Sequence, residues 1–169
     1  MDINSFYFDS VKLFKVKNRG KKVKNVAYSE LYNLSLPTQS LFDELKDKDF
    51  VATLLGLQKV EDNMYIIPFP ALRRMIGVTL KKSLALKIEG PKVIQNIITY
   101  VLYDGTLLYE VSFRVIDYSN GKCGMSVSLV IYYTERFLKD KVKKRLEIVT
   151  MSIMENMRKV LAPYLITPA

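Results

Sequence analysis

Histidine and tryptophan are missing from the 169 residues of this sequence, and cysteine occurs once, at Cys123. Histidine is the commonest general base and the commonest metal ligand in proteins, so Ser–His and Cys–His catalysis are excluded. A single cysteine excludes an internal disulfide and a cysteine-ligated metal cluster. Any catalysis must therefore rest on Asp, Glu, Lys, Arg, Tyr or an added cofactor, and we predict neither a metal nor a cofactor.

Long apolar runs are missing as well. No stretch of eighteen apolar residues occurs, whereas a membrane-spanning helix needs about 20. The opening Met1-Asp2-Ile3-Asn4 has neither the basic region nor the apolar region of a signal peptide. We therefore expect a cytoplasmic protein. An apolar fraction of 49% argues against disorder, and the length suits one domain with a real core.

Positive charge exceeds negative charge, with 26 lysines and arginines against 17 acidic residues and a net charge of +9. Such an excess fits a solvated face, an anionic membrane surface or an acidic protein partner. Nucleic acid is disfavoured because no glycine-rich phosphate loop or base-reading motif is present, although Phe8 and Phe14 lie among the first lysines. Two segments hold much of the excess: Lys12, Lys15, Lys17, Arg19, Lys21, Lys22 and Lys24, and then Arg136, Lys139, Lys141, Lys143, Lys144 and Arg145.

The end of the chain predicts one long amphipathic helix from Glu135 to Leu165. Burying a large apolar side chain stabilises a fold by roughly 1.5–3 kcal/mol, so the apolar stripe of this helix must pack against the strands that precede it. We expect a ligand cavity between the helix and those strands. On a helical period the stripe contains Leu138, Val142, Leu146, Val149, Ile153, Met157, Val160 and Tyr164.

Two further methionines on this helix lie off the centre of the stripe. Met154 is at its margin, and Met151 is on the polar side near Ile148 and Phe137. Such an exposed apolar spot predicts a cover, supplied by Phe6 and Phe8 of an N-terminal arm or by another subunit in a homodimer.

The rest of the pattern predicts an arm, two short helices and a series of antiparallel strands. The basic and aromatic arm covers residues 1–25 and is extended over Phe6–Val16, while the domain proper covers 26–165. The short helices are Ser40–Leu45, capped by Thr38, and Phe50–Leu55, ended by Gly56. Strands are expected at Val26–Leu34, Leu57–Glu61, Met64–Phe69, 76–89, 92–103, 107–115 and 125–133, with turns at Gly90-Pro91, Asp104-Gly105 and Ser119-Asn120-Gly121.

Two passages, Leu36–Leu45 and Leu54–Tyr65, carry a family resemblance. They resemble the strand-to-helix and glycine-then-hairpin passages of the helix-grip fold, which START lipid-transfer domains, the birch pollen allergen family and polyketide cyclases share (the SRPBCC superfamily). Within it, the chain looks most like the carbon monoxide dehydrogenase G-subunit family. The resemblance implies an α+β fold in which a curved antiparallel β-sheet of six to seven strands wraps around a long C-terminal helix. It also implies a hydrophobic cavity, but no reaction. The segment 68–74 departs from the family pattern.

The resemblance and the strand pattern together predict a non-catalytic binder of lipids, fatty acids or aromatic, polyketide-like molecules. Lys82 shares a register with Leu80 and Leu84, so we expect its side chain to face the cavity and pair with a ligand carboxylate. The alternatives are that a β-bulge turns the side chain away from the cavity, or that the long side chain reaches the edge of the cavity. The predicted lining comprises Leu80, Lys82, Leu84, Leu86, Tyr109, Val111, Phe113, Val127, Leu129, Ile131, Val149, Ile153 and Met157.

Polar residues on the strands leave two alternatives open. A cyclase- or dehydratase-like enzyme would use Lys82, Glu30 or Tyr109 for acid/base work in the same cavity. An accessory protein would dock an acidic or membrane partner through its basic faces. Glu30 shares one face of its strand with Tyr28 and Tyr32, but the pattern does not decide whether that face is inward. Ligand-orienting or ordinary sheet roles are both open for Gln95, Asn96 and Thr99.

Overall fold

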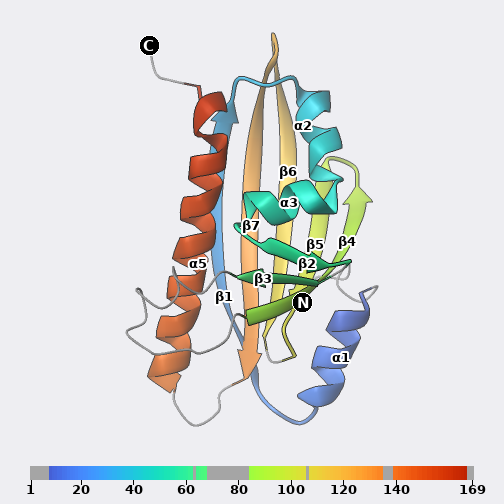
Figure 1. Ribbon diagram of the computed structural model, residues 1–169, viewed down its shortest axis with the longest axis vertical. Coiled ribbons are helices and arrows are strands. Elements are labelled where there is room, and N and C mark those ends of the chain that lie inside the picture. Colours follow the sequence, from blue (N-terminus) through green and yellow to red (C-terminus); the bar gives the residue numbers. More distant parts are fainter. Residues whose placement is uncertain (1–7, 63, 68–83, 106, 135–138, 167–169) are drawn as a thin grey trace.

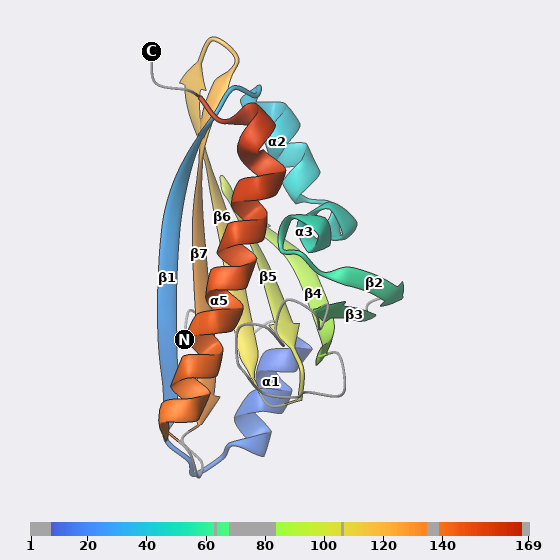
Figure 2. The same cartoon turned by 60° about the vertical axis from the view of Figure 1, so that its left-hand side comes forward.

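The computed structural model describes residues 8–62, 64–67, 84–105, 107–134 and 139–166, with the backbone alone at 67, 84, 139–145 and 148. Seven antiparallel strands form one sheet in the order β1-β7-β6-β5-β4-β3-β2. The sheet curves around α5 (Lys139–Leu161), as Figures 1 and 2 show. This α+β architecture confirms the predicted arrangement. The strands are β1 (Val23–Leu34), β2 (Gln58–Glu61), β3 (Met64–Ile67), β4 (Leu84–Ile94), β5 (Ile97–Tyr103), β6 (Leu108–Ser119) and β7 (Lys122–Thr134).

Two short helices, α2 (Thr38–Leu45) and α3 (Lys48–Leu54), follow β1 as predicted. Thr38 is the first residue of α2 and not its cap, because Pro37 precedes it and its hydroxyl donates instead to Asp117 Oδ1 at 2.8 Å. After α3, Gly56 adopts a φ of +77°, the predicted left-handed conformation. A side chain could not fit there without a shift, since an added Cβ would lie 3.0 Å from Asn156 Cγ on α5.

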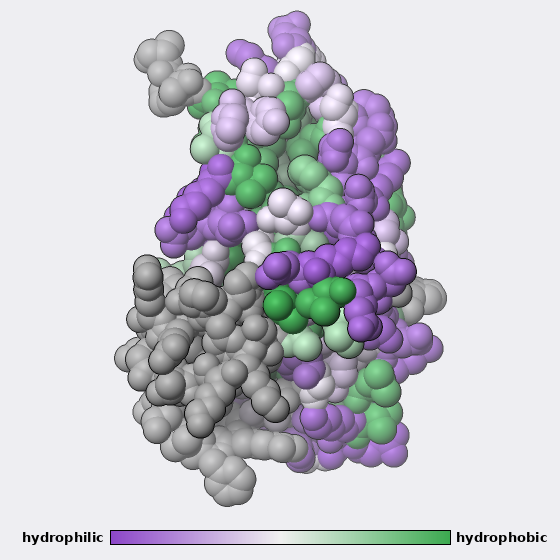
Figure 3. Space-filling view, viewed as in Figure 1, coloured by the Kyte–Doolittle hydropathy of each residue, from purple (hydrophilic) through white to green (hydrophobic). Residues whose placement is uncertain are grey.

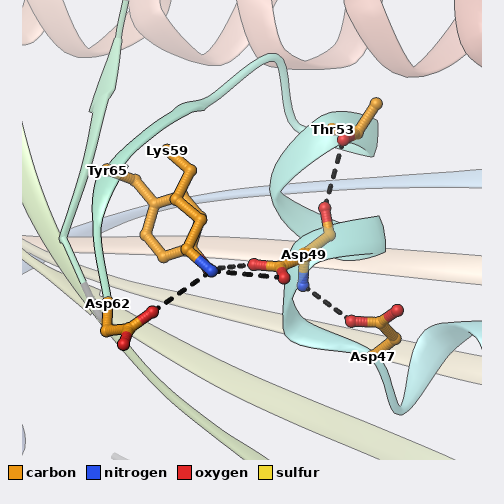
Figure 4. A network of polar contacts seen from close by, with 6 residues as sticks. All are labelled: Asp47, Asp49, Thr53, Lys59, Asp62 and Tyr65. Atoms are coloured by element: carbon orange, nitrogen blue, oxygen red, sulfur yellow. Dashed lines mark hydrogen bonds and ion pairs between the residues drawn. The ribbon is translucent and has the colours of Figure 1, made fainter.

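A polar network joins α3 to the β2–β3 hairpin (Figure 4). The side chain of Asp47 caps α3 by accepting from the backbone N–H of Asp49 at 2.9 Å. Asp49 accepts a hydrogen bond of 2.6 Å from the Tyr65 hydroxyl and forms an ion pair of 3.4 Å with Lys59. Burial and the bond to Asp49 raise the pKa of Tyr65. The network fixes the hairpin at one edge of the sheet against the short helices.

The N-terminal segment differs from the extended arm expected over Phe6–Val16, because Asp9–Lys17 forms helix α1. Phe8, Val11 and Phe14 recur at three-residue spacing, and all three are buried. They pack on the face of the sheet away from α5, in a second core cluster that includes Val101, Leu108 and Tyr132. Phe8 therefore does not cover the Met151 spot on α5, and Phe6 lies outside the described residues.

The region between β4 and β5 also differs from the expected strands. Gly90-Pro91 lies inside β4, at a bulge between Glu89 and Lys92, and is not a turn between strands. The turn comes later, at Gln95 and Asn96, which the pattern had placed within one strand over 92–103. Gln95 takes a φ of 53°, as a tight two-residue hairpin requires.

The C-terminal helix is shorter than the predicted Glu135–Leu165. It ends at Leu161 and continues as the 3₁₀ turn Ala162–Tyr164, because Pro163 has no N–H to continue an α-helix. The chain then returns to the sheet, where Leu165 bridges to Leu34. Residues 135–138 lie outside the described residues.

Candidate functional site

The face of the sheet that α5 covers is built from cross-strand rows of apolar side chains. Side chains alternate between the two faces of a strand, so the register of β6 with β7 decides which residues meet. The paired residues on this face are no more than 1% exposed and belong to one core cluster. They are Tyr109 with Ile131, Val111 with Leu129, and Phe113 with Val127.

The buried stripe of α5 completes this core. Leu146, Val149, Ile153 and Met157 are all buried, as the helical period predicts, and Met154 is buried beside them. Tyr164, in contrast, is 45% exposed, because the helix has ended before it. Of the other predicted members, Leu138 lies outside the described residues, Val142 is described by its backbone alone, and Val160 is partly buried.

A groove of about 640 Å³ lies between β1 and α5. The inward face of β1 carries Tyr28, Glu30 and Tyr32, which decides the question that the sequence left open. Met151, 60% exposed, lies on the outer part of the groove, while Met154, 7% exposed, also belongs to the core cluster. The groove therefore reaches from solvent to the apolar core. Its lining is Tyr28, Ser29, Glu30, Thr150, Met151, Met154, Glu155 and Arg158.

A polar network lies on the groove wall. Arg158 donates two hydrogen bonds to the Glu30 carboxylate, from Nε to Oε1 at 2.9 Å and from Nη2 to Oε2 at 3.1 Å. The Tyr32 hydroxyl donates to Glu30 Oε2 at 3.1 Å. Burial, and then the Glu30 carboxylate, raises the pKa of Tyr32 to about 12, so its phenol is protonated at neutral pH. The hydrogen bond to Glu30 raises the pKa of Arg158. Together these groups offer fixed polar contacts within a largely apolar wall.

A second pocket, of about 380 Å³, lies where the end of α5 meets α2 and α3. Nearby, Asn156 donates to the carbonyl oxygens of Thr53 and Leu54 at 3.0 and 3.1 Å and so satisfies the end of α3. The pocket is lined by Leu36, Ser40, Leu41, Glu44, Phe50, Val160, Leu161 and Tyr164.

The predicted lining residues divide into two sets. Leu80 and Lys82 lie outside the described residues, and the backbone alone describes Leu84. The other ten gather in the core cluster beneath α5, and none of them lines the groove or the second pocket. Their contact with a ligand stays a prediction. They are Leu86, Tyr109, Val111, Phe113, Val127, Leu129, Ile131, Val149, Ile153 and Met157.

Three of the polar candidates lie away from this core. Gln95 and Asn96 are exposed in the β4–β5 turn. Thr99 is buried on the opposite face of the sheet, where its hydroxyl lies 3.1 Å from that of Ser112. Sequence reasoning missed Arg158, whose only signal was its place one turn after Met154 on the helix. In the described ranges, no cluster of three or more Cys, Asp or Glu residues is placed to hold a metal ion, and no helix there has the length and apolarity needed to cross a bilayer.

Comparison with known proteins identifies the architecture. No protein-family model and no curated protein matches the sequence. Among solved structures, truncated norcoclaurine synthase from Thalictrum flavum superposes with a TM-score of 0.56 at 9% identity, covering 83% of this chain and 93% of that chain. An aromatase/cyclase from a Streptomyces species has a TM-score of 0.51 at 9% identity, covering 84% and 93%. A START superfamily protein from Mycobacterium smegmatis has a TM-score of 0.50 at 10% identity, covering 81% and 97%.

This is the helix-grip fold. Identities near 10% mean that the fold is what the chains share, and a fold hosts many activities. The helix-grip fold accounts for the long helix held by a curved sheet and for the two short helices after β1. The finer resemblance to the carbon monoxide dehydrogenase G-subunit family has no counterpart among these structures.

Proposed function

We propose that this chain binds hydrophobic small molecules between α5 and the concave face of the sheet, without catalysis. The observation that carries this proposal is the groove between β1 and α5, because Met154 belongs both to its wall and to the core cluster. A ligand entering the groove would exchange water for the side chains of Met151 and Met154 on α5. Each methylene buried in this way contributes about 0.8 kcal/mol, so a long-chain acid or an aromatic metabolite binds largely by burial.

The structural neighbours support this proposal at the level of the fold. One is a START superfamily protein, and two carry the names of enzymes, norcoclaurine synthase and aromatase/cyclase. We also propose that the chain is related to the carbon monoxide dehydrogenase G-subunit family, which it resembles at Leu36–Leu45 and Leu54–Tyr65. We propose a cytoplasmic location as well. Glu30, an acidic side chain that could pair with Lys82 inside the protein, already pairs with Arg158. We therefore propose Lys82 as the partner of a ligand carboxylate.

Native mass spectrometry of the purified chain, before and after organic extraction, tests for a co-purifying apolar molecule. Displacement of a fluorescent fatty acid then measures affinity. Met151→Asp places a charge on the groove wall and should weaken binding about tenfold, the effect of roughly 1.4 kcal/mol. Met64→Asp is the matched control, since Met64 is also exposed but lies on β3, near the opposite edge of the sheet. Equal affinities of the two variants would contradict a ligand in this groove.

Lys82→Met tests the head-group contact separately. It should reduce affinity for fatty acids but not for their neutral analogues, because only the acid carries a charge for the lysine to pair with. Unchanged selectivity for the acid would contradict that role while leaving the groove proposal intact.

A cyclase- or dehydratase-like enzyme is the second candidate, favoured by the polar network of Glu30, Tyr32 and Arg158 in the groove. In that case Glu30→Gln would abolish turnover while ligand binding remained. A pure binder would show no turnover of bound aromatic or polyketide-like molecules in the parent chain. Measuring substrate loss and binding on the same samples separates the two.

A further inference from the structure

Helix α1 has a second apolar side that faces solvent. Its inner side, with Phe8, Val11 and Phe14, is buried against the sheet. Leu13 and Val16 lie opposite, one helical turn apart, and are 55% and 63% exposed. Figure 3 shows this hydrophobic spot over α1 within a hydrophilic surround. Two exposed aliphatic side chains together on one short helix suggest a contact beyond the chain's own core.

Cations surround this spot. Residues 12–24 contain seven lysines and arginines and no acidic residue, and Asp9 is the one acidic residue of α1. Lys12 and Lys17 lie on either side of the Leu13–Val16 pair in the helical projection, and Lys17 Nζ donates to the carbonyl oxygen of Gly105. The exposed basic residues of the segment are Lys12, Lys17, Arg19, Lys21 and Lys22.

The fold brings the described part of the second basic segment, the backbone of 139–145, to the same end of the molecule. β1 begins at Val23, which pairs with Thr134 at the end of β7, and the Thr134 hydroxyl lies 3.5 Å from Asn18 Oδ1. The chain then continues to α5, which begins at Lys139. Figures 1 and 2 both show the α1–β1 connection and the start of α5 at one end of the long axis. Residues 12–24 and the backbone of 139–145, which are far apart in the sequence, therefore lie at one end of the molecule, the basic end.

The burial of the aromatic residues argues against nucleic acid as the partner of this end. Single-strand binders stack bases on exposed aromatic rings. Here Phe8 and Phe14 are 6% and 1% exposed, and Phe14 packs edge-on against Tyr103 at 6.4 Å. The apolar groups that remain exposed are aliphatic. Aliphatic side chains flanked by lysines match the interface of an anionic bilayer, where the apolar face enters the headgroup boundary and the cations contact acidic lipids.

We propose that the basic end docks on an anionic lipid bilayer, with Leu13 and Val16 entering the headgroup region and the lysines of residues 12–24 contacting acidic headgroups. Each basic residue held at such a surface strengthens binding about fivefold. Two inserted side chains add a modest apolar contribution, so the association is reversible. Leu13 and Val16 belong to α1, which packs on the face of the sheet opposite the α5 groove, and the proposal is therefore independent of ligand binding.

Flotation of the full chain with vesicles tests the proposal. Vesicles of equal parts phosphatidylcholine and phosphatidylglycerol should bind the chain, and vesicles of phosphatidylcholine alone should not. Binding should fall steeply as salt is raised, because the Debye length shortens from about 8 Å at 0.15 M to about 3 Å at 1 M. Lys21→Gln/Lys22→Gln should weaken partitioning about 25-fold. Lys122→Gln is the charge control, because Lys122 is exposed at the β6–β7 turn, at the other end of the sheet.

The serine variant Leu13→Ser/Val16→Ser separates a bilayer from other polyanions. It should lower vesicle partitioning about tenfold, a loss of roughly 1.4 kcal/mol, and leave binding to duplex DNA unchanged. Val60→Ser, at an exposed valine on β2, is the matched control. Circular dichroism confirms that each variant is folded. Equal flotation with neutral and anionic vesicles, full binding by the Leu13→Ser/Val16→Ser variant, or binding to DNA without binding to anionic vesicles would each overturn the proposal.

Discussion

Replacing Met157 by alanine tests whether the stripe of α5 is packed as the structure has it. Met157 is 0% exposed and belongs to the core cluster between α5 and the sheet. Truncating a buried methionine to alanine costs about 2–5 kcal/mol, because the lost burial is joined by a cavity that the surroundings fill only in part. For a chain of 169 residues, each kcal/mol lowers Tm by about 2–4 °C. We therefore expect Met157→Ala to lower Tm by roughly 4–20 °C.

Met151→Ala is the control for this experiment. The residue type, the substitution and the helix are the same, but Met151 is 60% exposed. Surface substitutions of this kind change stability by about 0.5 kcal/mol or less. Thermal and urea unfolding of both variants, followed by circular dichroism, gives the comparison. If the two variants unfolded at the same temperature and urea concentration, the side of α5 that faces the sheet would be wrongly assigned. The predicted cavity wall on α5 would then be wrong as well.

Two further predictions concern Tyr32 and α1. The contribution of Tyr32 to stability should be constant below pH 10 and fall between pH 10 and about 12, because unfolded tyrosine ionises near 10.0 whereas folded Tyr32 keeps its proton until about 12. Tyr32→Phe should make the decline in Tm over this pH range less steep, and an unchanged slope would contradict the assignment. Deleting residues 1–22 should uncover Val101, Leu108 and Tyr132 and so increase binding of a hydrophobic dye. Unchanged dye fluorescence would support residues 1–25 as a dispensable arm.

The alternation of apolar and polar residues along the strands predicted most of the sheet. Residues 109–115 and 125–129 alternate strictly, and the structure places Tyr109, Val111 and Val127 on one face because a strand has a period of two residues. The left-handed conformation of Gly56 and the turn at Ser119–Gly121 were also predictable from the sequence, because a positive φ favours glycine and asparagine. The Gln95-Asn96 hairpin was not predicted, since glutamine is a weak turn signal and apolar residues on both sides continue the strand pattern.

In the N-terminal segment, a mixture of apolar and charged residues concealed helix α1. Phe8, Val11 and Phe14 have helical spacing, but lysines between them and the exposed Leu13 and Val16 hide the period. Only the outer face of the sheet, with Val101 and Leu108, explains why one side of α1 is buried. The groove was unpredictable for the same reason, because it depends on how α5 lies against β1.

The sequence by itself determined which catalytic classes are excluded, which side of α5 is apolar and which strand residues share a face, because composition and short periods are local properties. Tertiary structure alone decided that Glu30 meets Arg158 across the groove and that residues 12–24 and the start of α5 share one end. These residues are more than 100 positions apart. Their contact is set by sheet register and helix packing, which depend on the whole chain at once.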